Sequence, residues 1–281
     1  MPDSLFPQYF ENLLNEKEKS AIQFLRQEEP VVGNPPYWVG FSGGKDSVVL
    51  KDLVLRAKVR HEFHYSVTTI DPPELIRFIR DCHPDIMWDK PRRPFMIAMS
   101  ERGLPMRPYH RWCCQEYKES GPASTSKCRL VVLGIRRAES SNRKVRKAKE
   151  QCFRVKSKIM INPILEWLDE DIWNYIKKHK IPYCNLYDQG FARLGCVGCP
   201  FASQKNRDRE FEKWPKYRKL YKIYINKLWK KNKHKPWAKA FDTGDELAEA
   251  WITKINPFPP KVLTELFDQY GDCRNQKDNG I

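Results

Sequence analysis

The chain has 281 residues, with 51 Lys and Arg against 35 Asp and Glu and a formal net charge of +16. This length allows one large domain, or a domain with an appendage, around a substantial core. No apolar run reaches the roughly 18 residues of a membrane-spanning helix, and the N-terminus lacks the features of a signal peptide, so we expect a cytoplasmic protein without membrane association. The basic balance favours polyanionic partners such as nucleic acid or nucleotides, with an ordinary basic protein as the alternative.

The N-terminal third begins with a predicted helix and continues into a predicted nucleotide loop. Residues 8–28 have apolar positions at helical spacing, and three prolines between 30 and 36 separate this helix from the apolar strand 37–41. The sequence Ser42-Gly-Gly-Lys-Asp-Ser47 follows this strand and leads into an apolar helix from Val48. Such a strand–turn–helix directs free amide groups and the helix dipole to one point, which suits a phosphate group.

The residue types in this loop suit the binding of a phosphate group. Gly43 and Gly44 allow close approach of an anion to the backbone, Lys45 adds a positive charge, and Ser42 and Ser47 add hydroxyl groups, either of which is able to cap the helix. Asp46 is a candidate Mg²⁺ ligand or an element of loop order, or simply a helix N-terminal cap. The spacing is not that of the Walker P-loop.

Strands and helices then alternate. Residues 61–70 predict a second strand, which Asp71-Pro-Pro-Glu74 ends before a further helix, and Leu130–Leu133 predicts a strand that ends at Gly134. This order indicates an α/β fold with a parallel sheet, in which ligands bind at the carboxyl ends of the strands. Because Gly43, Asp71 and Gly134 each follow a strand, we expect them to converge on one nucleotide.

Two later segments are strongly basic. Residues 129–158 contain eleven Arg and Lys against two Glu, and we interpret them as a mobile basic loop. Residues 215–232 predict a helix, in which Tyr217, Tyr221, Tyr224 and Trp229 recur at helical spacing between lysines. Such an aromatic stripe is more often core than a base-stacking surface, and the lysines between form either a solvated face or one that follows phosphates.

The cysteines indicate metal or redox chemistry, since disulfides are rare in a reducing compartment. Cys113 and Cys114 are adjacent, and Cys196 and Cys199 form a C-x-x-C pair. Four thiolates suit zinc or an iron–sulfur cluster, and adjacent cysteines bind two irons of one cubane more readily than a single ion, so a [4Fe–4S] cluster is favoured. Cys184 is an alternative ligand or a persulfide carrier.

Taken together, these motifs resemble the PP-loop ATP pyrophosphatase superfamily, and within it the iron–sulfur branch of the phosphoadenylyl-sulfate and adenylyl-sulfate reductases. Besides the loop and the cysteines, the segment from Gly134 to Ser140 with Arg143 resembles the family's G-x-R-x-x-E-S-x-x-R pattern. Further matches are Pro163–Trp173, Ile181–Tyr183, Leu186-Tyr-Asp188 and Gly190–Arg193, so that the resemblance spans about residues 38–202.

The resemblance implies a twisted parallel sheet with helices on both faces, of the adenine nucleotide alpha hydrolase type, and a C-terminal helical region. It implies phosphate and adenosine binding by Gly134, Arg136, Glu139 and Arg143, beside the loop and Asp71. We expect Lys45, Asp46 and Arg136 to be catalytic, and ATP, adenylyl sulfate or phosphoadenylyl sulfate to be the nucleotide, with Mg²⁺. The expected organisation is a helical segment over 1–30, a nucleotide-binding and iron–sulfur domain over 31–205, and a basic aromatic helical region over 206–281.

The chain departs from the assimilatory reductases near its end. These resemble one another in a catalytic Glu-Cys-Gly-[Ile/Leu]-His tail, whereas this chain has Cys273 without the following Gly and His. Our first hypothesis is therefore an ATP pyrophosphatase that adenylates a substrate for sulfur transfer, with nucleic acid as acceptor, as in DNA phosphorothioation, and a cysteine desulfurase as partner. The second is a reductase that releases sulfite, with Cys273 as a nucleophile and a thiol carrier. The third is a non-catalytic nucleic-acid-binding subunit with a structural cluster.

Overall fold

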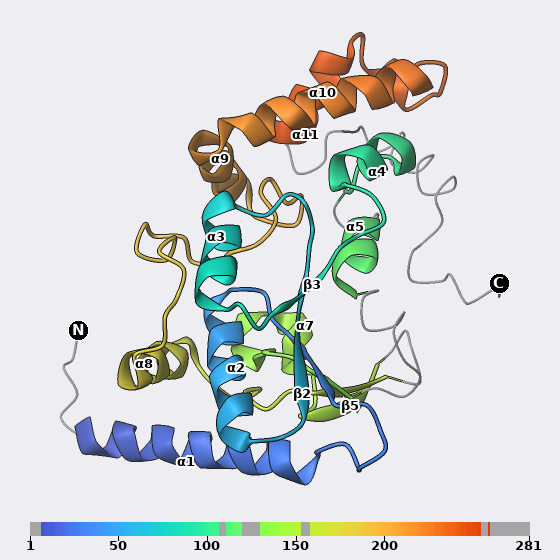
Figure 1. Cartoon of the computed structure of the whole chain (residues 1–281). Coiled ribbons are helices and arrows are strands. Elements are labelled where there is room, and N and C mark those ends of the chain that lie inside the picture. Colours follow the sequence, from blue (N-terminus) through green and yellow to red (C-terminus); the bar gives the residue numbers. More distant parts are fainter. Residues whose placement is uncertain (1–6, 107–110, 120–129, 153–157, 254–257, 259–281) are drawn as a thin grey trace. The chain divides into compact units, whose positions relative to one another are not determined.

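The computed structural model describes residues 7–106, 111–119, 130–152, 158–253 and Phe258 (Figure 1). The chain divides into two compact units, each assembled from three segments. The first contains residues 1–66, 73–89 and 120–194, and the second contains residues 67–72, 90–119 and 195–281. None of the helices in the described residues is both long and apolar enough to cross a membrane.

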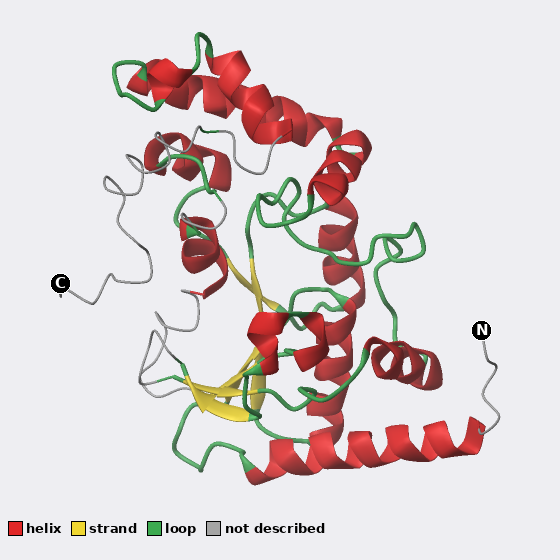
Figure 2. Cartoon of the chain, turned by 180° about the vertical axis from the view of Figure 1, so that it is seen from behind, coloured by secondary structure: helices red, strands yellow, loops and turns green. Residues whose placement is uncertain are grey.

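The first unit contains a six-stranded sheet, drawn in yellow in Figure 2. Its order is β3 (Met87–Asp89), β2 (His61–Ser66), β1 (Tyr37–Gly40), β4 (Leu130–Val132), β6 (Ile159–Ile161) and β5 (Lys149–Gln151). All neighbouring pairs are parallel except β5 with β6. The α/β prediction is therefore confirmed. The central strand β1 is buried at Tyr37, Trp38 and Val39, as expected for a strand covered on both faces.

The helices of this unit are α1 (Pro7–Gln27), α2 (Lys45–Ala57), α3 (Pro73–Cys82), η2 (Arg137–Glu139), α7 (Ser141–Lys144) and α8 (Asp169–His179). The predicted N-terminal helix over 8–28 agrees with α1. Helix α2 begins at Lys45, within the Ser42–Ser47 loop, and its residues Val49, Leu50, Leu53 and Val54 are completely buried. This burial fixes the start of α2, and thus the loop, against the end of β1.

The second unit is built around α10 (Pro215–Asn232), in orange in Figure 1. Its other elements are α4 (Phe95–Arg102), α5 (Trp112–Cys114), η1 (Gln115–Glu119), α9 (Gln204–Lys213), η3 (Ala238–Ala240) and α11 (Gly244–Thr253). Tyr221 of α10 is fully buried, 4.8 Å from the ring of Trp251 and 5.6 Å from that of Phe211. Tyr217, Tyr224 and Trp229 pack against the same core. The aromatic stripe is therefore core, and the base-stacking alternative is wrong.

The interpretation of residues 129–158 as a mobile loop is wrong for the described part of that segment. Residues 130–152 form β4, η2, α7 and β5. Carboxylates hold several of the arginines in place: Arg137 pairs with Glu166, Arg143 with Glu139 and Arg146 with Glu150. The count of charges in the sequence did not reveal these pairs. Two of them join residues four positions apart within the segment, and the partner of the third, Glu166, lies outside it. Residues 129 and 153–157 lie outside the described part.

Candidate functional site

The Ser42–Ser47 loop lies at the point where the strand order of the sheet reverses. From β1 the chain adds β2 and β3 on one side, whereas β4 pairs with the other side of β1. The loop follows β1, and Gly134 and Arg136 follow β4. Because β1 and β4 are parallel neighbours, both segments leave the same edge of the sheet. This is where open α/β sheets bind their ligands.

The backbone of the loop depends on Gly43, which has a φ of 72°. A Cβ atom at this position would lie 2.6 Å from Leu75 Cδ1 and 2.9 Å from Ile79 Cδ1, both of which belong to buried side chains of α3. Gly44 is the N-cap of α2 and has no side-chain cap, so the expectation that Ser42 or Ser47 caps the helix is wrong. Instead, the Ser47 hydroxyl donates to the Gly44 carbonyl at 2.8 Å.

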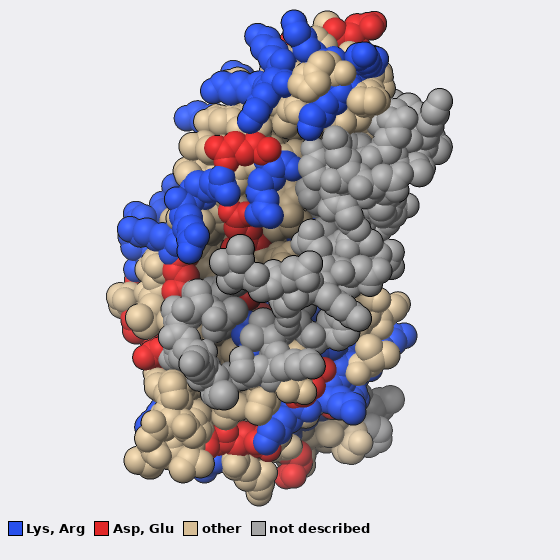
Figure 3. All heavy atoms as spheres, turned by 90° about the vertical axis from the view of Figure 1, so that its right-hand side faces the viewer, with Lys and Arg blue, Asp and Glu red and all other residues tan. Residues whose placement is uncertain are grey.

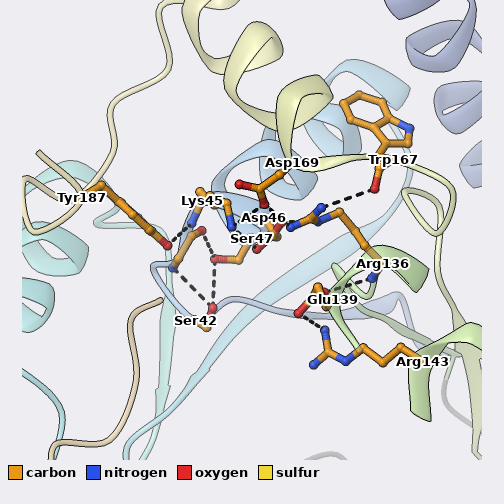
Figure 4. A network of polar contacts seen from close by, with 11 residues as sticks. Ser42, Lys45, Asp46, Ser47, Arg136, Glu139, Arg143, Trp167, Asp169 and Tyr187 are labelled. Atoms are coloured by element: carbon orange, nitrogen blue, oxygen red, sulfur yellow. Dashed lines mark hydrogen bonds and ion pairs between the residues drawn. The ribbon is translucent and has the colours of Figure 1, made fainter. Parts of the chain in front are cut away.

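Two buried cations, one from the start of α2 and one from the segment after β4, extend into one network (Figure 4). Lys45 is 6% exposed and Arg136 is 2% exposed. Arg136 Nε donates to Asp46 Oδ1 at 2.5 Å, and Arg136 Nη2 donates to Asp169 Oδ1 at 2.7 Å. Lys45 Nζ lies 3.1 Å from the same Asp169 oxygen and 3.5 Å from Asp46 Oδ2. The structure therefore brings the three predicted catalytic residues together, with Asp169 between the two cations.

The electrostatics of this network favour its charged forms. Partial burial works against the charge of Asp169, but the hydrogen bonds and charges of Lys45 and Arg136 outweigh it and lower its pKa. Burial likewise works against the charge of Arg136, but Asp46 and Asp169 outweigh it and raise the pKa of Arg136. A carboxylate thus occupies the position between two buried cations that a phosphate oxygen would suit.

The remaining predicted residues of the β4 segment lie beside this network. Glu139 accepts a hydrogen bond from the Arg136 backbone N–H at 3.0 Å and pairs with Arg143. A Cβ at Gly134 would lie 3.2 Å from the carbonyl oxygen of Asp46, so a small residue allows the two segments to approach. Glu139 therefore links Arg143 to the backbone of the arginine that contacts Asp46.

Two residues of the site were not assigned by sequence reasoning, Asp169 and Tyr187. The hydroxyl of Tyr187 accepts a hydrogen bond from the Lys45 backbone N–H at 2.9 Å, and its ring packs edge-on against Trp173 at 5.2 Å. It thus occupies an amide of the α2 N-terminus. Both residues lie in motifs that carry the family resemblance: Asp169 within Pro163–Trp173, and Tyr187 within Leu186–Asp188. Membership of these motifs was the feature of the sequence that could have identified them.

Asp71 belongs to the second unit. It is buried, and its Oδ2 accepts a hydrogen bond from the Thr68 hydroxyl at 2.6 Å. Its carbonyl oxygen accepts one from the Tyr217 hydroxyl at 2.7 Å. Convergence of Asp71 with Gly43 and Gly134 on one nucleotide stays a prediction.

The second unit also contains the four paired cysteines. Cys113 and Cys114 lie on α5, and Cys196 and Cys199 lie in the turn before α9. In that turn Gly198 has a φ of 71°, and a Cβ there would lie 2.4 Å from the Phe211 ring. The Gly198 N–H donates to Glu210 Oε2 at 2.7 Å, and Val197 is held by the Ile70 carbonyl at 2.8 Å. The C-x-x-C turn is therefore fixed by both main-chain and side-chain contacts.

The four thiols influence one another electrostatically. A hydrogen bond from Cys113 and the nearby charges of Arg111 and Lys118 lower the pKa of Cys114. Its hydrogen bond with Cys114, together with burial and the charges of Cys114, Cys196 and Cys199, raises the pKa of Cys113. Burial raises the pKa of Cys196 to about 12, against the charge of Lys118. The four thiols and the cations Arg111 and Lys118 therefore lie close enough to influence one another's charge.

Within the described residues, no three His, Cys, Asp or Glu side chains are arranged to hold a metal ion. Cys184 belongs to the first unit, where it is buried and its carbonyl oxygen accepts a hydrogen bond from Tyr187 N–H at 3.1 Å. Burial raises the pKa of its thiol. Cys273 lies outside the described residues. The assignment of cluster ligands therefore remains a prediction.

The fold and the glycine loop define a PP-loop protein of the α/β class. The model of the phosphoadenosine phosphosulfate reductase domain matches residues 36–202, more than half of the chain. The chain therefore belongs to the phosphoadenosine phosphosulfate reductase family, as its motifs predicted. A solved phosphoadenylyl-sulfate reductase of Candida auris, in complex with phosphate, shares the fold at a TM-score of 0.50 and 20% identity, over 65% of this chain and 93% of that one.

Several curated proteins are similar in sequence. An uncharacterised protein of Methanocaldococcus jannaschii is 30% identical over 77% of this chain and 48% of its own length, and a second is 28% identical over 70% and 50%. The chain thus spans about half the length of these relatives. An adenosine 5'-phosphosulfate reductase of Shouchella clausii is 28% identical over 70% of this chain and 84% of its own length.

Proposed function

We propose that the chain is a PP-loop ATP pyrophosphatase, which binds the phosphates of ATP at the Ser42–Ser47 loop. The observation that carries this proposal is the pair of buried cations, Lys45 and Arg136, beside the N-terminus of α2. The amides of α2 and the two cations together provide the donors that a triphosphate requires. The phosphate would take the place of the Tyr187 hydroxyl at the Lys45 amide and of Asp169 between the cations.

The proposed reaction adenylates a substrate. A substrate oxygen attacks the α-phosphorus of ATP, the bond to the oxygen that bridges the α- and β-phosphates breaks, and pyrophosphate leaves. Lys45 and Arg136 stabilise the charge that develops on the leaving group, and Asp46 positions Arg136 or holds Mg²⁺. A donor at the level of hydrosulfide then displaces AMP, which carries away the activated oxygen, so that sulfur takes its place.

We propose nucleic acid as the acceptor of sulfur, as in DNA phosphorothioation. The support is the net charge of +16 and the basic helix α10. The family resemblance implies a cysteine desulfurase as the source of sulfur, and a thiol reductant would supply the two electrons that release its persulfide sulfur at the level of hydrosulfide. Cys113, Cys114, Cys196 and Cys199 are the proposed ligands of a [4Fe–4S] cluster, which when bound supplies electron transfer or sulfur relay. In this proposal, Arg111 and Lys118 balance part of its negative charge.

The second candidate function is reduction of adenylyl sulfate or phosphoadenylyl sulfate to sulfite. It is favoured by the similarity to adenosine 5'-phosphosulfate reductases, of which one from Bacillus anthracis is 32% identical over 79% of its own length. In this function the Cys273 thiolate attacks the sulfur of the sulfonucleotide and the nucleoside phosphate leaves with the bridging oxygen. A thiol of the carrier then attacks the Cys273 sulfur, sulfite leaves, and a second thiol reduces the resulting disulfide. The incomplete tail motif around Cys273 is the argument against it.

One assay separates the two functions. Protein purified without oxygen is incubated with ATP, adenylyl sulfate or phosphoadenylyl sulfate. Each nucleotide is tested with DNA and a sulfide donor, and separately with a thiol reductant. Pyrophosphate and sulfite are measured in every sample. We expect AMP and pyrophosphate from ATP and no sulfite, and we expect Lys45→Gln to abolish pyrophosphate release whereas Lys58→Gln retains it. Sulfite release that is lost in Cys273→Ser would instead establish the reductase. The visible spectrum and iron content of the same sample test the cluster.

A further inference from the structure

Helix α10 has a solvent face of uniform charge. Its 18 residues include seven Lys and Arg and neither Asp nor Glu. Five of these, which we call the α10 basic face, are exposed and lie on one side of the helix: Lys216, Lys219, Lys227, Lys230 and Lys231. The opposite side carries Tyr221, Ile225 and Leu228, which are buried in the core of the second unit. The positive charge is therefore held on a rigid support.

The α10 basic face is not neutralised by carboxylates of the unit's described residues. Two other basic residues of the helix, Arg218 and Lys222, both pair with Glu249 of α11. In contrast, none of the five lysines of the face forms an ion pair with a carboxylate of the described residues. The region at the level of α10, at the top of Figure 3, is correspondingly dense in Lys and Arg. Such a surface lowers its electrostatic energy by binding a polyanion.

The geometry of the face suits the backbone of a nucleic acid. At about 1.5 Å per residue, Lys216 and Lys230 lie roughly 21 Å apart along the helix. Each strand of duplex DNA carries one phosphate per about 3.4 Å of its axis, so this length faces several phosphates. Lysine side chains are flexible point charges that contact phosphates without reading sequence. The aromatic side chains of α10 face the core, so base stacking has no platform here.

We propose that the α10 basic face is a docking surface for the phosphate backbone of nucleic acid, without sequence preference. This inference rests on the nucleic-acid acceptor of the proposed function and gives it a location. An anionic membrane suits the face less well, because a helix that lies on a membrane presents a broad apolar side, and that side of α10 is in the core. Only Leu220 and Ile223, 40% and 49% exposed, interrupt the lysines.

The test compares two triple variants with the same change in charge. One variant combines Lys219→Gln, Lys227→Gln and Lys230→Gln. The other changes three exposed lysines of the first unit to Gln: Lys19, Lys58 and Lys177. Binding of labelled duplex and single-stranded DNA and RNA is measured by fluorescence anisotropy at several salt concentrations, without nucleotide. We expect the α10 variant to bind at least tenfold more weakly, with a salt slope reduced by up to about 2.7, at about 0.9 for each lost phosphate contact. The control variant should bind within about twofold of the parent.

Two further measurements make the result decisive. Thermal unfolding and the affinity for an ATP analogue should be unchanged in the α10 variant, which shows that the fold and the nucleotide site are intact. Equal DNA binding by the two variants would overturn the inference, as would stronger binding of the parent to vesicles containing phosphatidylserine than to nucleic acid. Because DNA binding is measured without ATP, loss of the pyrophosphatase activity alone would count against the proposed reaction and not against this surface.

Discussion

At the scale of single residues, the candidate site is balanced in charge before any ligand arrives. Lys45, Arg136 and Arg143 are each paired with a carboxylate from Asp46, Asp169 or Glu139. Asp169 differs from the other two carboxylates because its side chain is 61% exposed, so it is able to move away into water. We therefore regard Asp169 as the group that a phosphate displaces.

The first prediction concerns this carboxylate. Asp169→Asn keeps an oxygen between Lys45 and Arg136 but removes the charge that neutralises them, so inorganic pyrophosphate should bind roughly three- to tenfold more tightly. Glu170→Gln is the control, because it removes the same charge from an exposed neighbour. Isothermal titration of both variants with pyrophosphate measures the effect. Weaker binding in Asp169→Asn would show that the carboxylate supports the ligand rather than competing with it.

The second prediction concerns the glycine of the loop. Gly43→Ala requires both an unfavourable φ and a displacement of buried Leu75 and Ile79, whereas Gly33→Ala, at a φ of 98°, meets no atom within 4 Å. We expect Gly33→Ala to cost about 1 kcal/mol and Gly43→Ala about 2–4 kcal/mol. At roughly 2–4 °C per kcal/mol, thermal unfolding resolves the two variants. Equal midpoints would mean that contact with α3 does not constrain the loop.

At the scale of elements, α1 is fixed to α2 and α8 by one buried carboxylate. Glu18 of α1 is 4% exposed, and its oxygens lie 3.0 Å from Arg56 Nη1 and 2.6 Å from Lys178 Nζ. Burial works against its charge, but the hydrogen bonds of Lys178, His179 and Arg56 outweigh it and lower its pKa from 4.5. A folded-state pKa below the unfolded value stabilises the protein above about pH 4.5, and this contribution is lost as the pH falls through the folded pKa.

The third prediction follows from the lowered pKa of Glu18 in the folded state. Glu18→Gln should destabilise the protein by about 1–3 kcal/mol at pH 7, and by progressively less as the pH is lowered below about 4.5 toward the folded-state pKa of Glu18. Glu16→Gln is the matched control, since Glu16 is 74% exposed and its one ion pair among the described residues is with Lys19. That variant should change the free energy of unfolding by less than about 0.5 kcal/mol. Denaturant titrations at pH 7 and at a pH well below 4.5 measure the free energy of unfolding. An equal loss of stability at the two pH values would contradict the ionic role of Glu18.

The elements were more predictable from sequence than the contacts between them. The loop after β1, the strand that ends before Gly134 and helix α10 follow from local patterns of apolar residues, Gly and Pro. The contacts of Asp169 with Lys45 and of Tyr187 with its amide join residues more than 120 positions apart, and no periodicity reports such pairs. The segment 130–152 was misread because its many Arg and Lys were counted as unpaired, whereas two of them pair with a carboxylate four residues away and Arg137 pairs with the distant Glu166.

At the scale of the whole molecule, the excess of positive charge and the nucleotide site are separate features. The loop network does not contribute to the net charge of +16, because its cations and carboxylates are equal in number. The unpaired charge is instead found on surfaces such as the α10 basic face. We therefore propose two kinds of anion for two surfaces of the chain, a nucleotide for the loop and a nucleic-acid backbone for α10.

The central claim is that the Ser42–Ser47 loop binds the phosphates of an adenine nucleotide. Isothermal titration of the anaerobic full chain with an α,β-methylene analogue of ATP tests it directly, with Lys45→Gln and Lys58→Gln titrated beside the parent. We predict saturable binding at one site, weakened at least tenfold in Lys45→Gln and unchanged in Lys58→Gln, with all three proteins unfolding at similar temperatures. Absence of binding to the parent, or equal affinity in Lys45→Gln, would contradict the account.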